Sequence, residues 1–286
     1  MTTTPVAEPE VHGADGPTDH GAAADALLEG GAERAGFLRR RPELILSPLL
    51  LVAIIVAWHL VVTYRDVSEF VMPKPGDVFD ALWRNTREGT YNHHLWFTVR
   101  NSLLGFVFGT AAGILVGAAL AASKVLERVL HPYLVAFQTF PKIALIPMLI
   151  IWFGFEATPK IVIAGILAFF PVMVNSYAGL VSIDEESEEL MRSLRASRWE
   201  TFLKLRFPTA LPYIFAGLEL ALVLAILGAV TGEFLGSKEG LGFLVQQFST
   251  QLRTEDSFSL LIVFGMLGVA AHMLVSWIRK RVIYWQ

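Results

Sequence analysis

Three ionisable side chains stand inside long apolar stretches of this sequence: Lys142, Glu219 and Glu233. A charge in the hydrocarbon core of a membrane costs about 2.5–3.5 kcal/mol, so such side chains normally face protein or water. Chemically, they could form an ion pair, line a polar route or pass a proton along a relay. Lys142 and Glu219 are a candidate ion pair; the alternative is that each extends separately to the membrane surface.

Glu233 follows Glu219 at a spacing close to four helical turns, so the two carboxylates would face a similar direction on one helix. A glycine-rich turn at residues 240–242 comes next. Two interpretations stay open: Glu233 is a pathway or gate residue, or its carboxylate is hydrogen-bonded to that turn. Gln138 and Asn175 are further polar candidates, which either line a route or bond between helices.

The longest charged segment between two apolar runs covers residues 184–212. Acidic residues at its start favour a helix N-terminus. Ser197 and Glu200 have the spacing of a capping box, which predicts the start of a second helix. Pro208 and Pro212 are expected to end that helix. The segment is therefore predicted to form two short amphipathic helices, with a bend between them, on a membrane surface.

Metal and nucleotide chemistry are not indicated. His59 and His272 stand alone in their apolar runs, and the pair His93-His94 is assigned to a surface loop. The chain has no cysteine, no phosphate-binding loop of the Gly-x-x-x-x-Gly-Lys-Ser/Thr type and no clustered catalytic set. We therefore predict no catalytic residue, no metal site and no cofactor in this chain. If ATP and Mg²⁺ are used, a partner chain binds them.

The elements that carry these residues are predicted to be membrane-spanning helices. Of the 286 residues, 54% are hydrophobic, and the mean hydropathy of +0.53 suits a chain that crosses a membrane several times. Residues 1–43 are rich in small and acidic residues and are expected to be a disordered tail. Residues 65–100 and 236–256 are expected to be polar connections. Six spans are predicted within residues 44–286, at 44–64, 101–123, 133–155, 161–183, 209–235 and 257–278.

An even number of spans places both ends of the chain on one side. Most Lys and Arg residues fall in the tail, in the connection between the second and third spans, in residues 184–212 and at the C-terminus. Because basic connections stay inside the cell, we expect both termini and residues 184–212 in the cytoplasm. Lys160 is assigned to the opposite side. The predicted class is an all-α, multi-pass protein of the cell membrane.

Gly105, Gly109, Gly113 and Gly117 recur at every fourth position of the second predicted span. Such spacing gives a helix a flat face that another backbone can approach closely. We favour close packing inside one subunit; a groove at a dimer contact or along a pathway is the alternative.

Residues 189–199 resemble the EAA loop of ABC-importer permeases, and Phe207-Pro208-Thr209-Ala210-Leu211-Pro212 closes the segment as that family does. Arg195 stands where the family has a glycine. The resemblance implies that the segment is the coupling helix, which sits in a cleft of a separate cytoplasmic ATPase. The residues to which it gives this coupling role are Glu188, Glu189, Met191, Arg192, Leu194, Arg195, Ala196, Ser197, Trp199 and Phe202.

Further motifs extend the resemblance over roughly residues 44–286. Residues 140–147, 151–154, 169–171 and 232–236 are similar to the nitrate/sulfonate/taurine subgroup of these permeases. This implies a type I importer core in the lipid bilayer, with two permease copies (a homodimer), two ATPase subunits and an extracytoplasmic substrate-binding protein. No nucleic-acid partner is predicted.

The substrate is left open by the sequence. The subgroup points to an organic or inorganic anion of the sulfonate, taurine or nitrate type. The alternative is an aromatic or heterocyclic nutrient, such as a thiamin-precursor pyrimidine, riboflavin or an aromatic acid. A more distant alternative is an ion-coupled secondary transporter that uses Lys142, Glu219 and Glu233 as a relay; it would need inverted repeats.

Overall fold

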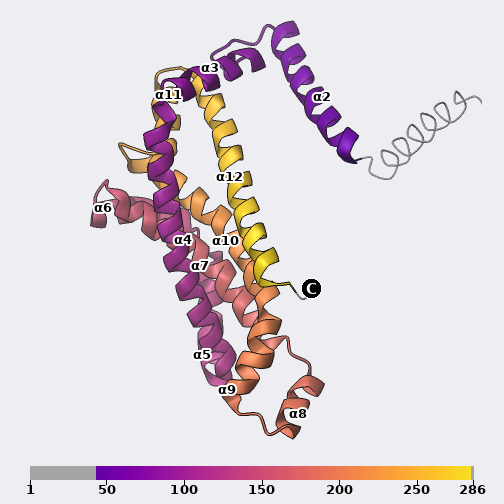
Figure 1. Ribbon diagram of the computed structural model, residues 1–286. Coiled ribbons are helices and arrows are strands. Elements are labelled where there is room, and N and C mark those ends of the chain that lie inside the picture. The colour runs from indigo at the N-terminus through magenta and orange to yellow at the C-terminus, as the bar shows by residue number, and fades with distance from the viewer. Residues whose placement is uncertain (1–42, 285–286) are drawn as a thin grey trace, which may run out of the picture. The chain divides into compact units, whose positions relative to one another are not determined.

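The computed structural model describes residues 43–284, and within this range its regular elements are all helices (Figure 1). The predicted tail lies outside the described residues, apart from Glu43. The elements are α2 (Glu43–Tyr64), α3 (Pro75–Arg87), α4 (Thr90–Ala122), α5 (Lys124–Thr139), η1 (Lys142–Leu145), α6 (Ile146–Phe153), α7 (Ala157–Val181), α8 (Glu185–Ser193), α9 (Arg198–Thr201), η2 (Phe202–Arg206), α10 (Phe207–Gly236), α11 (Leu241–Thr250) and α12 (Thr254–Val282).

The chain divides into two compact units, at Leu60 and Val61. The described part of the first unit is most of α2, an apolar helix long enough to cross a membrane. The second unit holds all the later helices, and every site discussed below lies within it.

Within residues 43–284, five helices are long and apolar enough to span a membrane, and a sixth span results if α5 and the η1–α6 pair count as one. The predicted spans 44–64, 161–183, 209–235 and 257–278 each agree with one helix to within a few residues. The predicted span 133–155 is instead two helical pieces bent by 82°. The break has a local cause: Pro141 disfavours helical backbone at the residue before it, and Phe140 is extended.

Two expected polar connections contain helices, which corrects the interpretation of residues 65–100 and 236–256. α3 lies in the first and is amphipathic, with Val78 and Ala81 buried. α4 begins at Thr90 rather than at residue 101, so His93-His94 lies on a helix and not in a loop. α11 lies in the second. A search for long apolar runs misses such elements because only one face of each helix is apolar.

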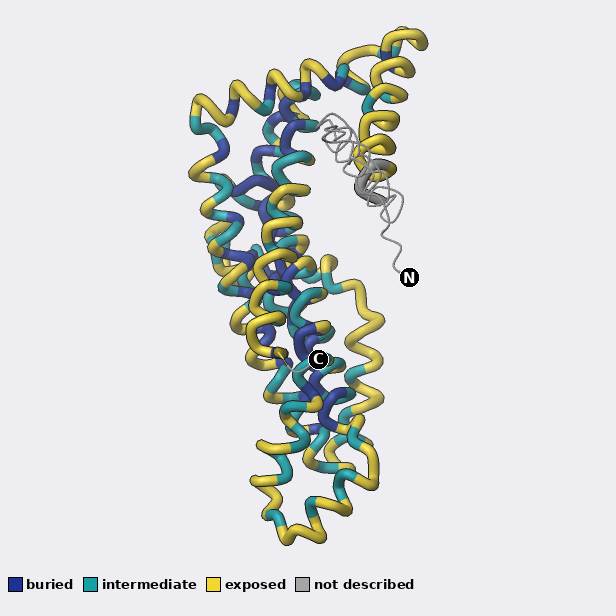
Figure 2. The backbone as a smooth tube through the Cα atoms, turned by 45° about the vertical axis from the view of Figure 1, so that its right-hand side comes forward, coloured by how far each residue is buried: buried dark blue, intermediate teal, exposed yellow. Residues whose placement is uncertain are grey.

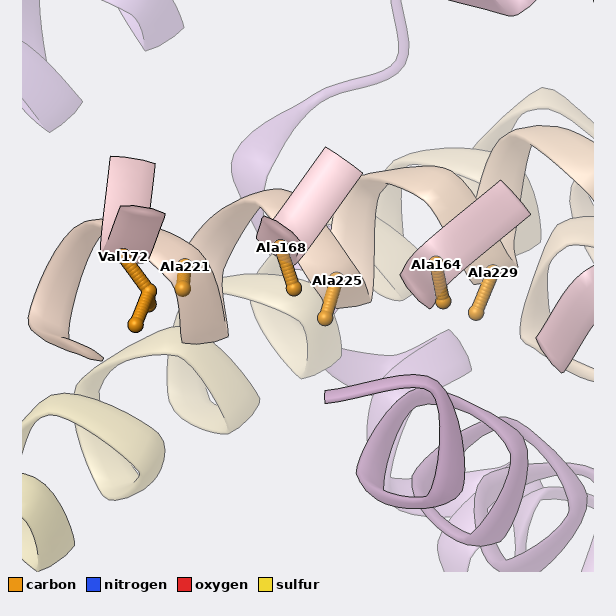
Figure 3. Packing of buried hydrophobic residues seen from close by; sticks show 6 residues of the cluster. All are labelled: Ala164, Ala168, Val172, Ala221, Ala225 and Ala229. Carbon is orange, nitrogen blue, oxygen red and sulfur yellow. The ribbon is translucent and has the colours of Figure 1, made fainter. Parts of the chain in front are cut away.

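The core of the second unit is the contact of α7 with α4 and α10. Small residues spaced four apart on α7 meet small residues with the same spacing on α10, which lets the two backbones approach closely (Figure 3). The buried residues of this contact are Ala164, Ala168, Val172, Ala221, Ala225 and Ala229. By contrast, α8, α9 and η2 contain no buried residue, as the yellow and teal segment at the lower end of Figure 2 shows.

The four glycines of α4 lie against α7 of the same chain. A Cβ atom placed on Gly109 would lie 2.3 Å from the backbone oxygen of Gly165, and one placed on Gly117 would lie 2.7 Å from that of Met173. Close packing within one subunit therefore accounts for the spacing of the four glycines.

Candidate functional site

The segment that resembles a coupling loop begins with a capped helix. The Asp184 carboxylate accepts hydrogen bonds from the Ser187 backbone N–H, at 3.2 Å, and from its hydroxyl, at 3.0 Å. These bonds hold the pKa of the Asp184 carboxyl below its usual value. Acidic residues fill the first turn of α8, where they face the positive end of the helix dipole.

The bend after α8 is a Schellman motif. The Ala196 N–H donates to the Met191 carbonyl at 3.0 Å, and the Arg195 N–H donates to the Arg192 carbonyl at 2.9 Å. Arg195 has a φ of 53°, in the left-handed region that favours glycine. Arg195 thus stands at the position where the EAA loop carries glycine, and its backbone adopts the conformation that glycine favours.

Arg195→Gly is expected to stabilise the bend by about 0.5–1 kcal/mol, because a left-handed backbone strains every residue with a Cβ. Amide hydrogen exchange of α8 should slow by a corresponding factor of about two to five. Arg192→Gly is the control within the helix: this position should lose about 1 kcal/mol from poorer helix propensity, in addition to its ion pair with Glu188. Faster exchange in both variants would contradict a strained bend.

The second helix starts as the spacing of Ser197 and Glu200 predicts. Both bonds of the capping box form, with the Ser197 N–H donating to Glu200 at 2.8 Å and the Glu200 N–H donating to the Ser197 hydroxyl at 3.2 Å. The expected end of this helix at the two prolines is wrong. The Phe207 N–H donates to the carbonyl of Phe202, five residues back, and this wider turn carries the helix into α10 past Pro208.

The surface of the segment combines exposed apolar side chains with an internal brace. Leu194 is 69% exposed, and Trp199, which stacks on Phe202, is 65% exposed. Glu188 accepts from Arg192 at 3.3 Å and from Arg206 at 3.0 Å. Because Arg206 is the last residue of η2, directly before α10, the second bond joins α8 to the start of α10. Partial burial acts to raise the pKa of Glu188, but the two guanidinium groups outweigh it and hold that pKa below its usual value.

The Glu233 carboxylate lies at the other end of α10 and is fully buried. Its Oε2 atom accepts from the Thr98 hydroxyl at 2.8 Å and from the Gly242 N–H at 3.0 Å, which is the bond to the turn that one interpretation required. Gly240 has a φ of 105°, and a Cβ there would lie 2.2 Å from the Glu233 carboxyl carbon. The Gly240 N–H donates to His94 Nδ1 at 3.0 Å.

Lys160 is a buried cation that the sequence interpretation assigned to an outer connection. Its Nζ atom donates to the carbonyls of Phe155 at 2.6 Å, Glu156 at 2.9 Å and Gly236 at 2.5 Å. The side chain therefore joins the start of α7 to the end of α10. The aliphatic part of the Lys160 side chain packs against α10 at Gly232, where an added Cβ would lie 3.3 Å from Lys160 Cγ.

Asp256 is a second buried charge that the sequence interpretation missed. Its carboxylate binds Arg84 at 2.9 Å and Arg253 at 2.7 Å, and it accepts from the buried Asn85 amide. The cluster fastens α3 to the start of α12. Arg84 and Asn85 bind one carboxylate oxygen and Arg253 binds the other, so both oxygens have partners and the role of Asp256 is structural.

The predicted Lys142–Glu219 ion pair is wrong. Glu219 pairs with Arg279 of α12 at 3.1 Å. The Lys142 ammonium donates to the Gln138 carbonyl at 2.8 Å and lies 4.7 Å from the centre of the Phe170 ring. The break between α5 and η1 explains the difference, because it leaves carbonyls at the end of α5 without helical partners. The Asn175 amide donates within its own helix, to Pro171, at 2.8 Å.

Three cavities follow one another along α5 and α7. The first, which we call the apolar cavity, measures about 980 Å³ and includes Lys142 and Phe170 in its lining. The second, of about 340 Å³, shares Leu134 with the first and includes Gln138. The third, of about 280 Å³, shares Tyr177 with the second and ends beside Glu188 and Arg206 of the charged segment. The three separate cavities thus lie next to one another between the helix break and residues 184–212.

Helices long and apolar enough to span a membrane, a hollowed face and an exposed helical elbow are features expected of a membrane transport subunit. The family described as "Binding-protein-dependent transport system inner membrane component" matches residues 109–284. The chain belongs to this family, and the predicted identification as an ABC-importer permease is confirmed.

Individual relatives agree with this assignment. The chain is 31% identical to the putative aliphatic sulfonates transport permease protein SsuC of Bacillus subtilis, over 83% of this chain and 87% of the relative. It is 29% identical to the formylaminopyrimidine transport permease protein ThiX of Halalkalibacterium halodurans, over 87% of this chain and 99% of the relative. Its fold is similar to a chain of the inward-facing MetNI methionine ABC transporter, with a TM-score of 0.58 at 20% identity; 66% of this chain and 94% of the other are covered.

Proposed function

We propose that this permease forms half of the translocation pathway of an ATP-driven importer for a small organic or inorganic anion of the sulfonate, taurine or nitrate type. A second, identical copy supplies the other half, a separate ATPase binds ATP and Mg²⁺, and an extracytoplasmic binding protein delivers the solute. The bent pair α5 and η1–α6 counts as one span, so that six spans place both termini and residues 184–212 in the cytoplasm. The family to which the chain belongs supports the division of labour.

The observation that carries the proposal is the exposed elbow formed by α8, the bend and α9. Large apolar side chains rarely stay in water without a partner, and here Leu190, Leu194 and Trp199 all lie exposed beside charged residues. The ion pair of Glu188 with Arg206 connects the elbow to the start of α10, so a displacement of the elbow is transmitted to a spanning helix. Such an element suits docking into a motor whose movement must reach the membrane.

The ion-coupled alternative loses support from the same structure. A relay requires Lys142, Glu219 and Glu233 to share one route. Glu219 instead pairs with Arg279, Glu233 binds Thr98 and the turn after α10, and Lys142 caps the end of α5. The alternative substrate class, a heterocyclic nutrient, is supported by the similarity to the relative named for formylaminopyrimidine transport.

Trp199→Ala and Glu189→Arg are each expected to lower solute uptake per ATP hydrolysed by about tenfold. Trp199 is exposed in this chain, and a tryptophan that becomes buried when a partner docks commonly dominates the affinity of the interface. Glu189→Arg reverses a charge on the same docking segment. The measurement compares vanadate-sensitive ATP hydrolysis with uptake in proteoliposomes that contain the complete importer. Trp96→Ala is the matched control, since Trp96 on α4 is also 65% exposed. Uptake at normal rates in both elbow variants would refute docking at this segment.

A further inference from the structure

The apolar cavity lies at the break between α5 and η1 and has one charged group in its wall. Its lining includes Phe137, Phe140, Phe169 and Phe170, and Lys142 is the only ionisable residue among those that line it. Its volume of about 980 Å³ falls in the range of sites that hold small organic molecules. The cavity thus offers a large aromatic surface together with one positive charge.

Among the residues that the structure describes, the Lys142 ammonium has no carboxylate partner. Two backbone carbonyls accept from it, that of Gln138 at 2.8 Å and that of Phe140 at 3.5 Å, and Phe170 lies under it. Among residues 46–284, no carboxylate lies within ion-pair distance of it. Carbonyl dipoles fix the position of the group without neutralising its charge, and a cation in apolar surroundings is stabilised by an anion.

The broken backbone supports a binding role for the same place. Irregular backbone at membrane depth persists only where it is buried in protein or lines a cavity that water or solute can enter. Here Phe140 is extended, and Lys142 begins a short 3-10 turn directly on the cavity wall. The break therefore places Lys142 in the wall of the apolar cavity.

We propose that the apolar cavity binds a small organic anion, with its acidic head on Lys142 Nζ and its apolar body against the phenylalanines of the cavity wall. This specifies the substrate class and rests on the proposed function for its place on the import route. An inorganic anion would leave the aromatic wall without contact, and a neutral heterocycle would leave the ammonium without a counter-charge. A sulfonate or carboxylate with an aromatic or short aliphatic body satisfies both.

The test uses the importer complex in lipid nanodiscs and labelled benzenesulfonate as the probe, with empty nanodiscs subtracted. Wild type should bind benzenesulfonate and prefer it over neutral benzyl alcohol. Lys142→Gln keeps a hydrogen-bond donor but removes the charge, and it should weaken binding at least about tenfold and abolish that preference. Lys142→Arg should restore binding. Lys238→Gln, a change at an exposed lysine, should bind as wild type does.

Three results would overturn the site: no benzenesulfonate binding by wild type, equal binding by Lys142→Gln, or equal binding of benzyl alcohol. The first is expected if lipid or a second copy of the chain fills the cavity. The proposed function is checked separately, by binding-protein-stimulated ATP hydrolysis in the same nanodiscs. Stimulated hydrolysis without a charge-dependent site refutes only the substrate class, whereas charge-dependent binding without stimulated hydrolysis refutes the importer role.

Discussion

Gly109→Ala is expected to prevent the normal packing of α4 on α7. The added Cβ would lie 2.3 Å from the backbone oxygen of Gly165 and 2.9 Å from its Cα and carbonyl carbon. Backbone atoms cannot rotate aside as a side chain can, so the two helices must separate along their whole contact. Overpacking of a tight interior costs about 1–3 kcal/mol, and a backbone collision belongs at the upper end. We expect a melting temperature lowered by several degrees and a reduced yield of folded protein in size-exclusion chromatography.

Gly268→Ala separates this collision from the general effect of changing a glycine in a spanning helix. Gly268 lies in α12, and a Cβ there would meet no atom within 4 Å. Alanine favours the helix by about 1 kcal/mol relative to glycine, so this variant should be as stable as wild type or more so. If Gly109→Ala and Gly268→Ala melted alike, the close α4–α7 contact would not hold in the folded protein.

The spanning helices were predictable because one physical quantity defines them. A run of apolar residues long enough to cross a bilayer has few other stable locations, and α7, α10 and α12 follow from that alone. Pro141 interrupts the third predicted span in the sequence, but the sequence alone does not give the 82° bend that follows from it. Whether a proline breaks a helix or is absorbed depends on its neighbours: Phe140 turns extended, while a wider turn before Pro208 keeps that helix continuous.

The pairing of charges was less predictable than their presence. Lys142 and Glu219 were identified as ionisable residues in apolar runs. Their partners could not be inferred, because positions along the chain do not show which helices pack together or where a helix breaks. Arg279 of α12 pairs with Glu219, and Lys142 donates to a carbonyl that lacks a helical partner only because the helix breaks. By contrast, the capping box at Ser197 was predictable, because both of its bonds join residues three apart.

Buried charges near helix ends escaped notice for a related reason. Lys160 stands at the edge of an apolar run and Asp256 in an expected polar connection, where surface residues are common. Burial of each depends on a neighbouring helix: α10 covers Lys160, and α3 supplies Arg84 and Asn85 to Asp256. A sequence without its tertiary contacts gives no sign of either.

Lys160→Met is expected to lower the free energy of unfolding by about 3 kcal/mol, because it removes a donor that serves three carbonyls. Methionine fills a similar volume but donates nothing, so the Gly236 carbonyl loses its partner in a buried position and the carbonyls of Phe155 and Glu156 lose theirs in partly buried ones. An unsatisfied buried acceptor costs about 1–3 kcal/mol, and hydrogen bonds from a charged donor are among the stronger ones. The loss should fall on the junction of α7 with α10.

The measurement is thermal unfolding of the purified permease, combined with hydrogen exchange at the end of α10. Lys160→Met should lower the melting temperature and speed exchange around Gly236, whereas Lys238→Met, a change at an exposed lysine two residues further on, should leave both unchanged. Lys160→Arg keeps the charge but adds a planar group that the close approach to Gly232 does not accommodate, so it should recover only part of the stability. If Lys160→Met and wild type had the same melting temperature, water would satisfy the three carbonyls and Lys160 would not stabilise the junction of α7 with α10.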